Sequence, residues 1–249
     1  MISITRKKRF MTISEIYFWD QSYLPNVDTD FIQLVQSTYT INKNSREKHT
    51  SIIRLDTEDS YIFSNMHKKY RNEIRRVQKD QSNFSYDLML NPSKEMLTEF
   101  QLRYDTFSKK VKITSFNHAR ARQLLKKNAL FLSKLMFGDG NWIYHCYACD
   151  SSRARLLYSV SDYSVGKNDQ NYSKMAMLNK YMHWLDIIEF KDKGFLIYDF
   201  GGISKDGSLK NIDDFKRKFG GIDIIEYNTI HARSTLGKFM YHAGGRYFI

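Results

Sequence analysis

The sequence has few cysteines, few prolines and no long apolar segment, and each shortage excludes a class of protein. Two cysteines in 249 residues are too few for a disulfide framework and favour a reducing compartment. Two prolines argue against Pro-rich linkers. No run of eighteen apolar residues occurs, and the basic opening "MISITRKKRF" has no apolar region behind it. We therefore expect a cytoplasmic protein without a membrane span or a secretory signal.

Positive charge is in excess. The chain has 39 Lys and Arg against 27 Asp and Glu, which gives a net charge of +12 and a pI near 9.5. Such a protein attracts anions over long range. Nucleic acid, an anionic membrane face and a nucleotide or coenzyme A substrate all fit, and a solvated basic surface is the alternative explanation.

The hydrophobic patterns predict an α/β fold with two domains, residues 1–90 and 91–249. In the first, "HTSIIRLD" and "NFSYDLML" read as strands, and the helix between them has Tyr70, Ile74 and Val77 on one face. In the second, helices and strands alternate in a mixed sheet. The expected helices span 92–111, 117–138, 174–193 and 212–219, and the expected strands span 141–150, 154–163, 195–200 and 222–227.

A carboxylate ends the apolar strand "FLIYDF". Ligands of open α/β sheets gather at the carboxyl ends of strands, so Asp199 is a candidate catalytic residue. The alternative is that Asp199 only binds the backbone amides of the Gly201–Gly202 turn.

One polar line runs along the otherwise apolar helix 174–193. Asn179, His183 and Asp186 follow one another at helical spacing. We expect Asp186 to orient His183 as a general base, with a buried histidine beside an ordinary salt bridge as the alternative.

Basic residues form two further groups. Lys68, Arg71, Arg75 and Lys79 follow one helix face, and Lys216, Arg217 and Lys218 precede a glycine pair. Both groups suit phosphate oxygens, and a solvated helix face is the alternative for each. Lys167, in the loop "SVGKND", lies where helix N-terminal amides attract an anion.

The pair "CYAC" at Cys146 and Cys149 has metal-ligand spacing. Residues three apart in a strand point to opposite faces, and no second pair exists. We therefore expect no metal site.

Four segments together resemble a known family: "KYRNEIRRVQKD", "LNKYMHWLDIIEFKDKG", "YDFGGI" and "FKRKFGG". The chain from about residue 69 to 227 is similar to the GNAT superfamily of N-acyltransferases, in its FemAB-like branch. That branch includes peptidoglycan aminoacyltransferases and bacterial nucleotide-sugar N-acyltransferases. The resemblance implies a mixed, splayed sheet flanked by helices, with residues 1–90 as a degenerate second copy or a cap.

The resemblance also implies where the substrates bind. The acyl-CoA donor would lie between the end of "LLYSVSDY" and the start of "FLIYDF". There the backbone at Ser159, Val160 and Ser161 is expected to hold the oxyanion, and Lys167 the donor's anionic part. His183 or Asp199 would serve as the base. The expected acceptor- and phosphate-binding residues are Arg71, Arg75, Asn179, Trp184, Lys216 and Arg217.

The expected activity is transfer of an acyl group from coenzyme A to the amine of a nucleotide-linked amino sugar. A dTDP-amino-dideoxyhexose for surface polysaccharide, such as the O-antigen of lipopolysaccharide, is the leading acceptor. Coenzyme A thioester is the co-substrate, and no tightly bound cofactor is expected. The alternatives are an aminoacyltransferase that uses charged tRNA and a nonenzymatic nucleotide-binding module. A homodimer is left open.

Overall fold

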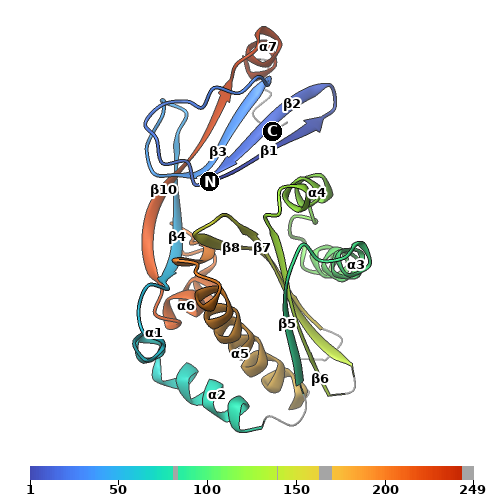
Figure 1. The fold of residues 1–249 in the computed structure, drawn as a ribbon, viewed down its shortest axis with the longest axis vertical. Coiled ribbons are helices and arrows are strands. Elements are labelled where there is room, and N and C mark those ends of the chain that lie inside the picture. Colours follow the sequence, from blue (N-terminus) through green and yellow to red (C-terminus); the bar gives the residue numbers. More distant parts are fainter. Residues whose placement is uncertain (81–83, 139, 163–169, 243–249) are drawn as a thin grey trace. The chain divides into compact units, whose positions relative to one another are not determined.

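The computed structural model describes residues 1–80, 84–138, 140–162 and 170–242. The chain forms two compact units (Figure 1). The smaller unit comprises residues 1–50, 118–127 and 224–249, and the larger comprises 51–117 and 128–223.

Among the described residues, the smaller unit is a mixed sheet with two helices. Strand β1 pairs antiparallel with β2, β2 runs parallel to β3, and β3 pairs antiparallel with β10, which is followed by the first part of β4. Its core contains Ile13, Ile16 and Phe31, all at most 1% exposed. The elements are β1 (Ile2–Lys8), β2 (Met11–Tyr17), β3 (Phe31–Ser37), β4 (Arg46–Arg54), α4 (His118–Lys126), β10 (Ile222–Ala232) and α7 (Thr235–His242).

The larger unit holds a second run of strands in the order β4-β9-β8-β7-β6-β5. Strands β5 to β8 are antiparallel neighbours, and β9 runs parallel to β8. The elements are α1 (Asp59–Asn65), α2 (Lys68–Lys79), β5 (Phe84–Leu90), α3 (Lys94–Val111), β6 (Leu130–Phe137), β7 (Asn141–Cys149), β8 (Arg153–Ser161), α5 (Gln170–Asp192), β9 (Ile197–Gly202) and α6 (Lys210–Lys218). The expected mixed α/β class is confirmed.

Helices cover both faces of these strands (Figure 1). Tyr144 of β7 contacts Phe100 of α3, whereas Tyr147 contacts Phe190 of α5. Residues three apart in a strand point to opposite faces, so α3 and α5 lie on opposite sides. Helix α2 then packs on α5. Its Tyr70, Ile74 and Val77 are buried, as their spacing predicted.

The expected helix 117–138 is wrong in its second half. Helix α4 ends at Lys126, and residues 130–137 form strand β6. Asn128 has φ +52°, which interrupts the helix. Leu130, Phe131 and Leu132 are all buried, and a continuous apolar run of this length fits a buried strand as well as a helix.

The two units do not follow a single division after residue 90. Strand β5 pairs along its whole length with β6, and α2 packs on α5, so residues 51–90 belong with the larger unit. The smaller unit is instead completed by α4 and β10.

Helix α5, with 23 residues, is the longest described helix. None of the helices in the described ranges combines the length and the hydropathy of a bilayer crossing.

Candidate active site

Strands β8 and β9 separate soon after they meet. They pair only at Arg153 with Ile197, Ala154 with Tyr198 and Arg155 with Asp199. Strand β8 nevertheless stays paired with β7 as far as Ser161. Its register shifts at Leu157, and such a bulge bends a strand. The parallel pair therefore opens beyond residue 155, as the resemblance implies.

A polar cavity of about 350 Å³ lies at the far end of β8, beyond the part that pairs with β9, and helices α2, α5 and α6 form its other walls. Strand β8 contributes Ser161, α5 contributes Asn179 and Lys180, and α6 contributes Asp214 and Lys218. Lys180 also pairs with Glu73, at 2.9 Å. Amide, hydroxyl and ammonium groups thus line one concave surface together with Tyr70, Met175 and Phe215, and a few polar groups among apolar side chains are typical of ligand sites.

A buried histidine joins this cavity to the core of the unit. The Nε2 atom of His145 lies 3.1 Å from Oδ1 of Asn179, and its Nδ1 lies 2.6 Å from Oδ2 of Asp186. Tyr86 and Tyr147 donate hydrogen bonds to the same carboxylate, at 2.8 and 2.6 Å. Three donors around a fully buried carboxylate stabilise its charge. Asn179 is therefore held in place by the His145–Asp186 pair.

His183 belongs to the same network but has a different partner. Its Nδ1 lies 2.7 Å from the hydroxyl of Tyr198, which lies 2.9 Å from that of Tyr147. Its ring stacks on His145 with centroids 4.2 Å apart. Burial, the neighbouring His145 and the charge of Lys216 hold the pKa of His183 well below 6.5, so its imidazole is neutral at pH 7.

The expected pairing of His183 with Asp186 is replaced by that of His145 with Asp186. Sequence reasoning missed His145 and the three tyrosines that complete the network. The sequence could have pointed to two of these residues, because side chains alternate along strand β7 and His145 and Tyr147 therefore share one face.

Asp199 is fully buried and bound by protein groups. Arg153 donates to its Oδ2 through Nη2 at 2.7 Å and Nε at 3.1 Å, and the amide of Gly201 donates to Oδ1 at 2.7 Å. The structure therefore shows the backbone contact that sequence reasoning weighed as the alternative to a catalytic role.

The glycines around this strand serve close packing. Gly201 has φ +77°, and a Cβ atom there would lie 3.3 Å from the carbonyl oxygen of Leu156, where β8 and β9 separate. A Cβ atom on Gly220 would lie 2.9 Å from the carbonyl oxygen of Asn65. Lys216 donates to the carbonyls of Gly201 and Gly202 and is only 9% exposed. Its ammonium therefore binds the end of β9.

Three of the expected acceptor-binding residues have structural partners. Arg71 donates to the carbonyls of Ser64 and Met66 at the end of α1. Arg217 bonds to Asp223 at 2.8 Å. The guanidinium of Arg75 lies 5.1 Å from the ring of Phe63.

The remaining candidates lie in different surroundings. Trp184 is 8% exposed and packs on Phe63. Ser159 and Val160 face His145 and Tyr144 on the neighbouring strand. Lys167 is outside the described residues. Of the residues expected to bind the donor or the acceptor, the cavity therefore brings together Asn179 and Ser161.

Metal chemistry has little support in the described residues. Candidate ligand atoms of His145, His183 and Asp186 lie within 4.8 Å of one another. The facing atoms of His145 and Asp186 already bond to each other and to Tyr147. Both cysteines are buried thiols whose pKa is raised by burial, which disfavours the thiolate that binds metals.

No protein-family model matches the sequence, and no curated protein does so either. Solved structures share its fold. FemX aligns with a TM-score of 0.60 at 12% identity over 82% of this chain, which spans only 65% of FemX. The C-terminal domain of a protein assigned as a lysylphosphatidylglycerol synthetase, from Agrobacterium fabrum, aligns at 0.55 and 9% identity, over 98% of this chain and 84% of that one. L-PGS from Bacillus licheniformis aligns at 0.51 and 14% identity, over 86% and 71%. At these identities the likeness shows a common fold.

Proposed function

We propose that this chain is an acyltransferase whose donor lies between strands β8 and β9. One observation carries the proposal: the two strands part after three residue pairs, and a polar cavity lies beyond that point, at the end of β8. Likeness to FemX and to the lysylphosphatidylglycerol synthetases supports transfer of an acyl or aminoacyl group from an activated carrier.

In the leading form of the proposal, acyl-CoA is the donor and a nucleotide-linked amino sugar, such as a dTDP-amino-dideoxyhexose, is the acceptor. The amine nitrogen attacks the thioester carbonyl, the C–S bond breaks, and coenzyme A leaves as a thiol once the amine has lost a proton. Lys218 is the proposed partner of the phosphate groups, because Lys180 is paired with Glu73 and Asp214 adds a carboxylate to the same cavity.

The proposed roles follow from the hydrogen-bond network. Asn179 orients the acceptor, because it lines the cavity and is fixed by His145. His183, neutral at pH 7, is the proposed base, reached through a water molecule because its side chain is only 2% exposed. Backbone amides at Ser159–Ser161, beyond the last β9 partner of β8, hold the oxyanion.

A second donor, aminoacyl-tRNA, is favoured by the fold likeness to FemX and by the net charge of +12. Phosphate contacts would then make binding fall steeply as salt rises, because they release counterions.

The test is a donor and acceptor panel followed by two readouts. Free thiol is measured with acyl-CoAs crossed with dTDP- and UDP-linked amino sugars, and loss of the aminoacyl ester is measured with charged tRNA and the same acceptors. We expect acceptor-dependent release from one donor class, and we expect an Asn179→Ala variant of unchanged stability to lose it. A folded wild-type protein that is silent with both donor classes would refute the proposal.

A further inference from the structure

Most of the excess positive charge lies on the smaller unit. Its three segments contain 14 Lys and Arg against 6 Asp and Glu, a net charge of +8, whereas the larger unit carries +4. The sequence "RKKRF" at residues 6–10 supplies four of these bases. The cavity formed by the end of β8 with α2, α5 and α6 belongs to the larger unit and leaves this charge unexplained.

The turn between β1 and β2 exposes an aromatic ring among bases. Lys8 pairs with Met11, so Arg9 and Phe10 form a two-residue turn. Arg9 has φ +57°, a conformation that favours glycine in such turns, yet the sequence places an arginine and a phenylalanine there. Phe10 is 63% exposed. Arg6, in contrast, is buried against Glu15, which also binds Arg120 of α4.

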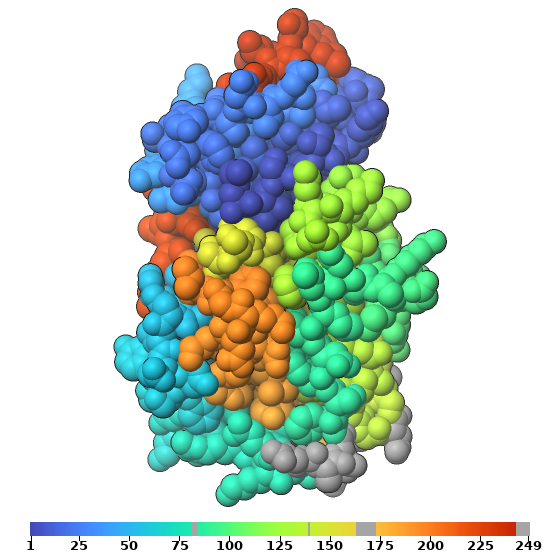
Figure 2. All heavy atoms as spheres, viewed as in Figure 1, coloured from blue at the N-terminus to red at the C-terminus, as the bar shows by residue number. Residues whose placement is uncertain are grey.

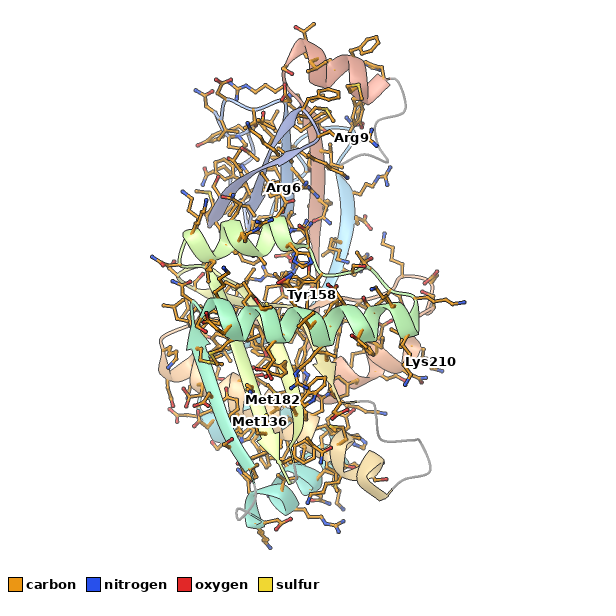
Figure 3. All side chains as sticks on the ribbon, turned by 90° about the vertical axis from the view of Figure 1, so that its right-hand side faces the viewer. Arg6, Arg9, Met136, Tyr158, Met182 and Lys210 are labelled. Carbon is orange, nitrogen blue, oxygen red and sulfur yellow. The ribbon has the colours of Figure 1, made fainter. Side chains whose placement is uncertain are left out.

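Helix α7 exposes apolar side chains at the same end of the unit. Phe239 is 70% exposed and Leu236 is 44% exposed, three residues apart on one helical face, with Lys238 exposed beside them. Figure 2 shows the N-terminal hairpin in blue and α7 in red at the surface at this end. Figure 3 labels Arg9 toward α7 and Arg6 toward α4.

One carboxylate joins the turn to the helix. Asp30 accepts hydrogen bonds from the amide and hydroxyl of Thr12, at 2.8 and 2.9 Å, and from the hydroxyl of Ser234, at 2.6 Å. Ser234 in turn accepts from the amide of Gly237 in α7. Met240 and Tyr241 of α7 pack on the cluster of Met11, Ile13 and Phe31. The turn and the helix therefore present their exposed side chains as one fixed edge.

We propose that this edge docks on an anionic lipid surface. The hairpin–α7 edge consists of Lys7, Lys8, Arg9, Phe10, Leu236, Lys238 and Phe239. Its rings and leucine enter the interface between headgroups and acyl chains, while the bases bind lipid phosphates. Lipid fits better than RNA because leucine and phenylalanine offer hydrocarbon without hydrogen-bonding groups, and three of the four bases are lysines, which act as point charges. The proposal does not depend on the proposed transferase activity.

The test is sedimentation of the whole protein with vesicles of 30% phosphatidylglycerol in phosphatidylcholine, and with pure phosphatidylcholine vesicles. We expect binding to the anionic vesicles that weakens with salt. Phe10→Gln with Phe239→Gln should weaken it about tenfold or more, because two buried rings are lost. Lys7→Gln with Lys8→Gln and Lys238→Gln should weaken it roughly fivefold per base. Phe10→Trp should retain it.

Matched controls lie on the larger unit. Leu102→Gln removes a leucine that is 67% exposed, and Lys68→Gln with Lys109→Gln and Lys112→Gln removes three exposed lysines. Both control variants should bind vesicles like the wild type, and thermal melting should show all variants folded. Wild-type protein that ignores anionic vesicles, or aromatic variants that bind as well as wild type, would overturn the proposal. Binding to a single-stranded RNA without vesicle binding would overturn it in favour of nucleic acid.

Discussion

The imidazole of His145 lies 2.6 Å from the carboxylate of Asp186, and neither side chain is exposed to solvent. The pair connects strand β7 to helix α5, and through Asn179 it reaches the cavity at the end of β8. A buried charge with this many partners fixes geometry, because each unmet hydrogen bond would carry a large cost. The network is therefore well suited to hold one cavity-lining amide in place.

Replacing Asp186 with asparagine should damage both stability and turnover. Three donors would lose a charged acceptor, so we expect a loss of about 2–4 kcal/mol in the free energy of unfolding. Tyr86→Phe removes only one of those donors and should lose about 1 kcal/mol. Urea denaturation of the two variants checks this order, and equal losses would contradict the assigned network.

Replacing Asn179 with alanine should separate activity from stability. Its side chain is partly exposed, so water in the cavity can replace the hydrogen bond that His145 loses, and we expect a loss of no more than about 1 kcal/mol in the free energy of unfolding. Acceptor-dependent turnover should fall at least tenfold, since the oriented amide is lost. Asn72→Ala, on the exposed face of α2, is the matched control and should leave both quantities unchanged. Full turnover in the Asn179 variant would remove that residue from the site.

Stability should fall as the pH drops below 6.5, in part because of His183. Its pKa in the folded state is held well below the ordinary 6.5, so below that pH the unfolded chain binds a proton that the folded chain does not. The stabilisation is complete above pH 6.5 and is lost as the pH falls toward the folded pKa. One such proton gives a slope of about 1.4 kcal/mol per pH unit.

The measurement is urea denaturation between pH 5 and 8 for wild type and His183→Phe. The free energy of unfolding of the variant should fall less steeply with pH below 6.5. Phenylalanine binds no proton in the unfolded chain, so this contribution to the slope is lost. Identical slopes would mean that His183 titrates normally in the folded protein.

Gly220 should tolerate alanine less well than Gly207. Both glycines have positive φ, +82° and +71°. Alanine at either position should therefore lower the free energy of unfolding by about 1 kcal/mol through backbone strain. A Cβ atom at Gly220 also meets the carbonyl of Asn65 at 2.9 Å, whereas nothing lies within 4 Å of one at Gly207. We expect the free energy of unfolding of the Gly220 variant to fall by roughly a further 1–3 kcal/mol, because the added Cβ atom overpacks this site. Equal thermal shifts would show that the turn between α6 and β10 can move away.

Periodicity predicts the parts of this fold in which side chains pack within one element. The helix around Tyr70, Ile74 and Val77 and the polar line of Asn179, His183 and Asp186 could both be read from the sequence. The hairpin of β1 and β2 could not be recognised from the sequence. Ile2 and Ile4 point inward as in a strand, but the next inward position is the charged Arg6, which breaks the apolar pattern. Only the distant Glu15 makes that position acceptable for a charge.

The partners in the candidate site could not be read in the same way. Asp186 has His145 as its partner rather than His183, and these residues are 41 positions apart on different elements. No local pattern encodes which carboxylate meets which imidazole when a strand and a helix pack together. The helical spacing of His183 and Asp186 would allow the two side chains to pair. Helix α5 packs on β7, however, and Asp186 there bonds to His145.

The most direct test of the central claim is to fill the cavity at its β8 side. Ser161→Trp places a large ring in the cavity that Asn179 also lines. With the donor and acceptor that the wild type uses, this variant should stay folded and lose acceptor-dependent acyl transfer by a factor of roughly one hundred or more. Turnover at the wild-type rate in a folded Ser161→Trp protein would contradict the claim that acyl transfer takes place between β8 and β9.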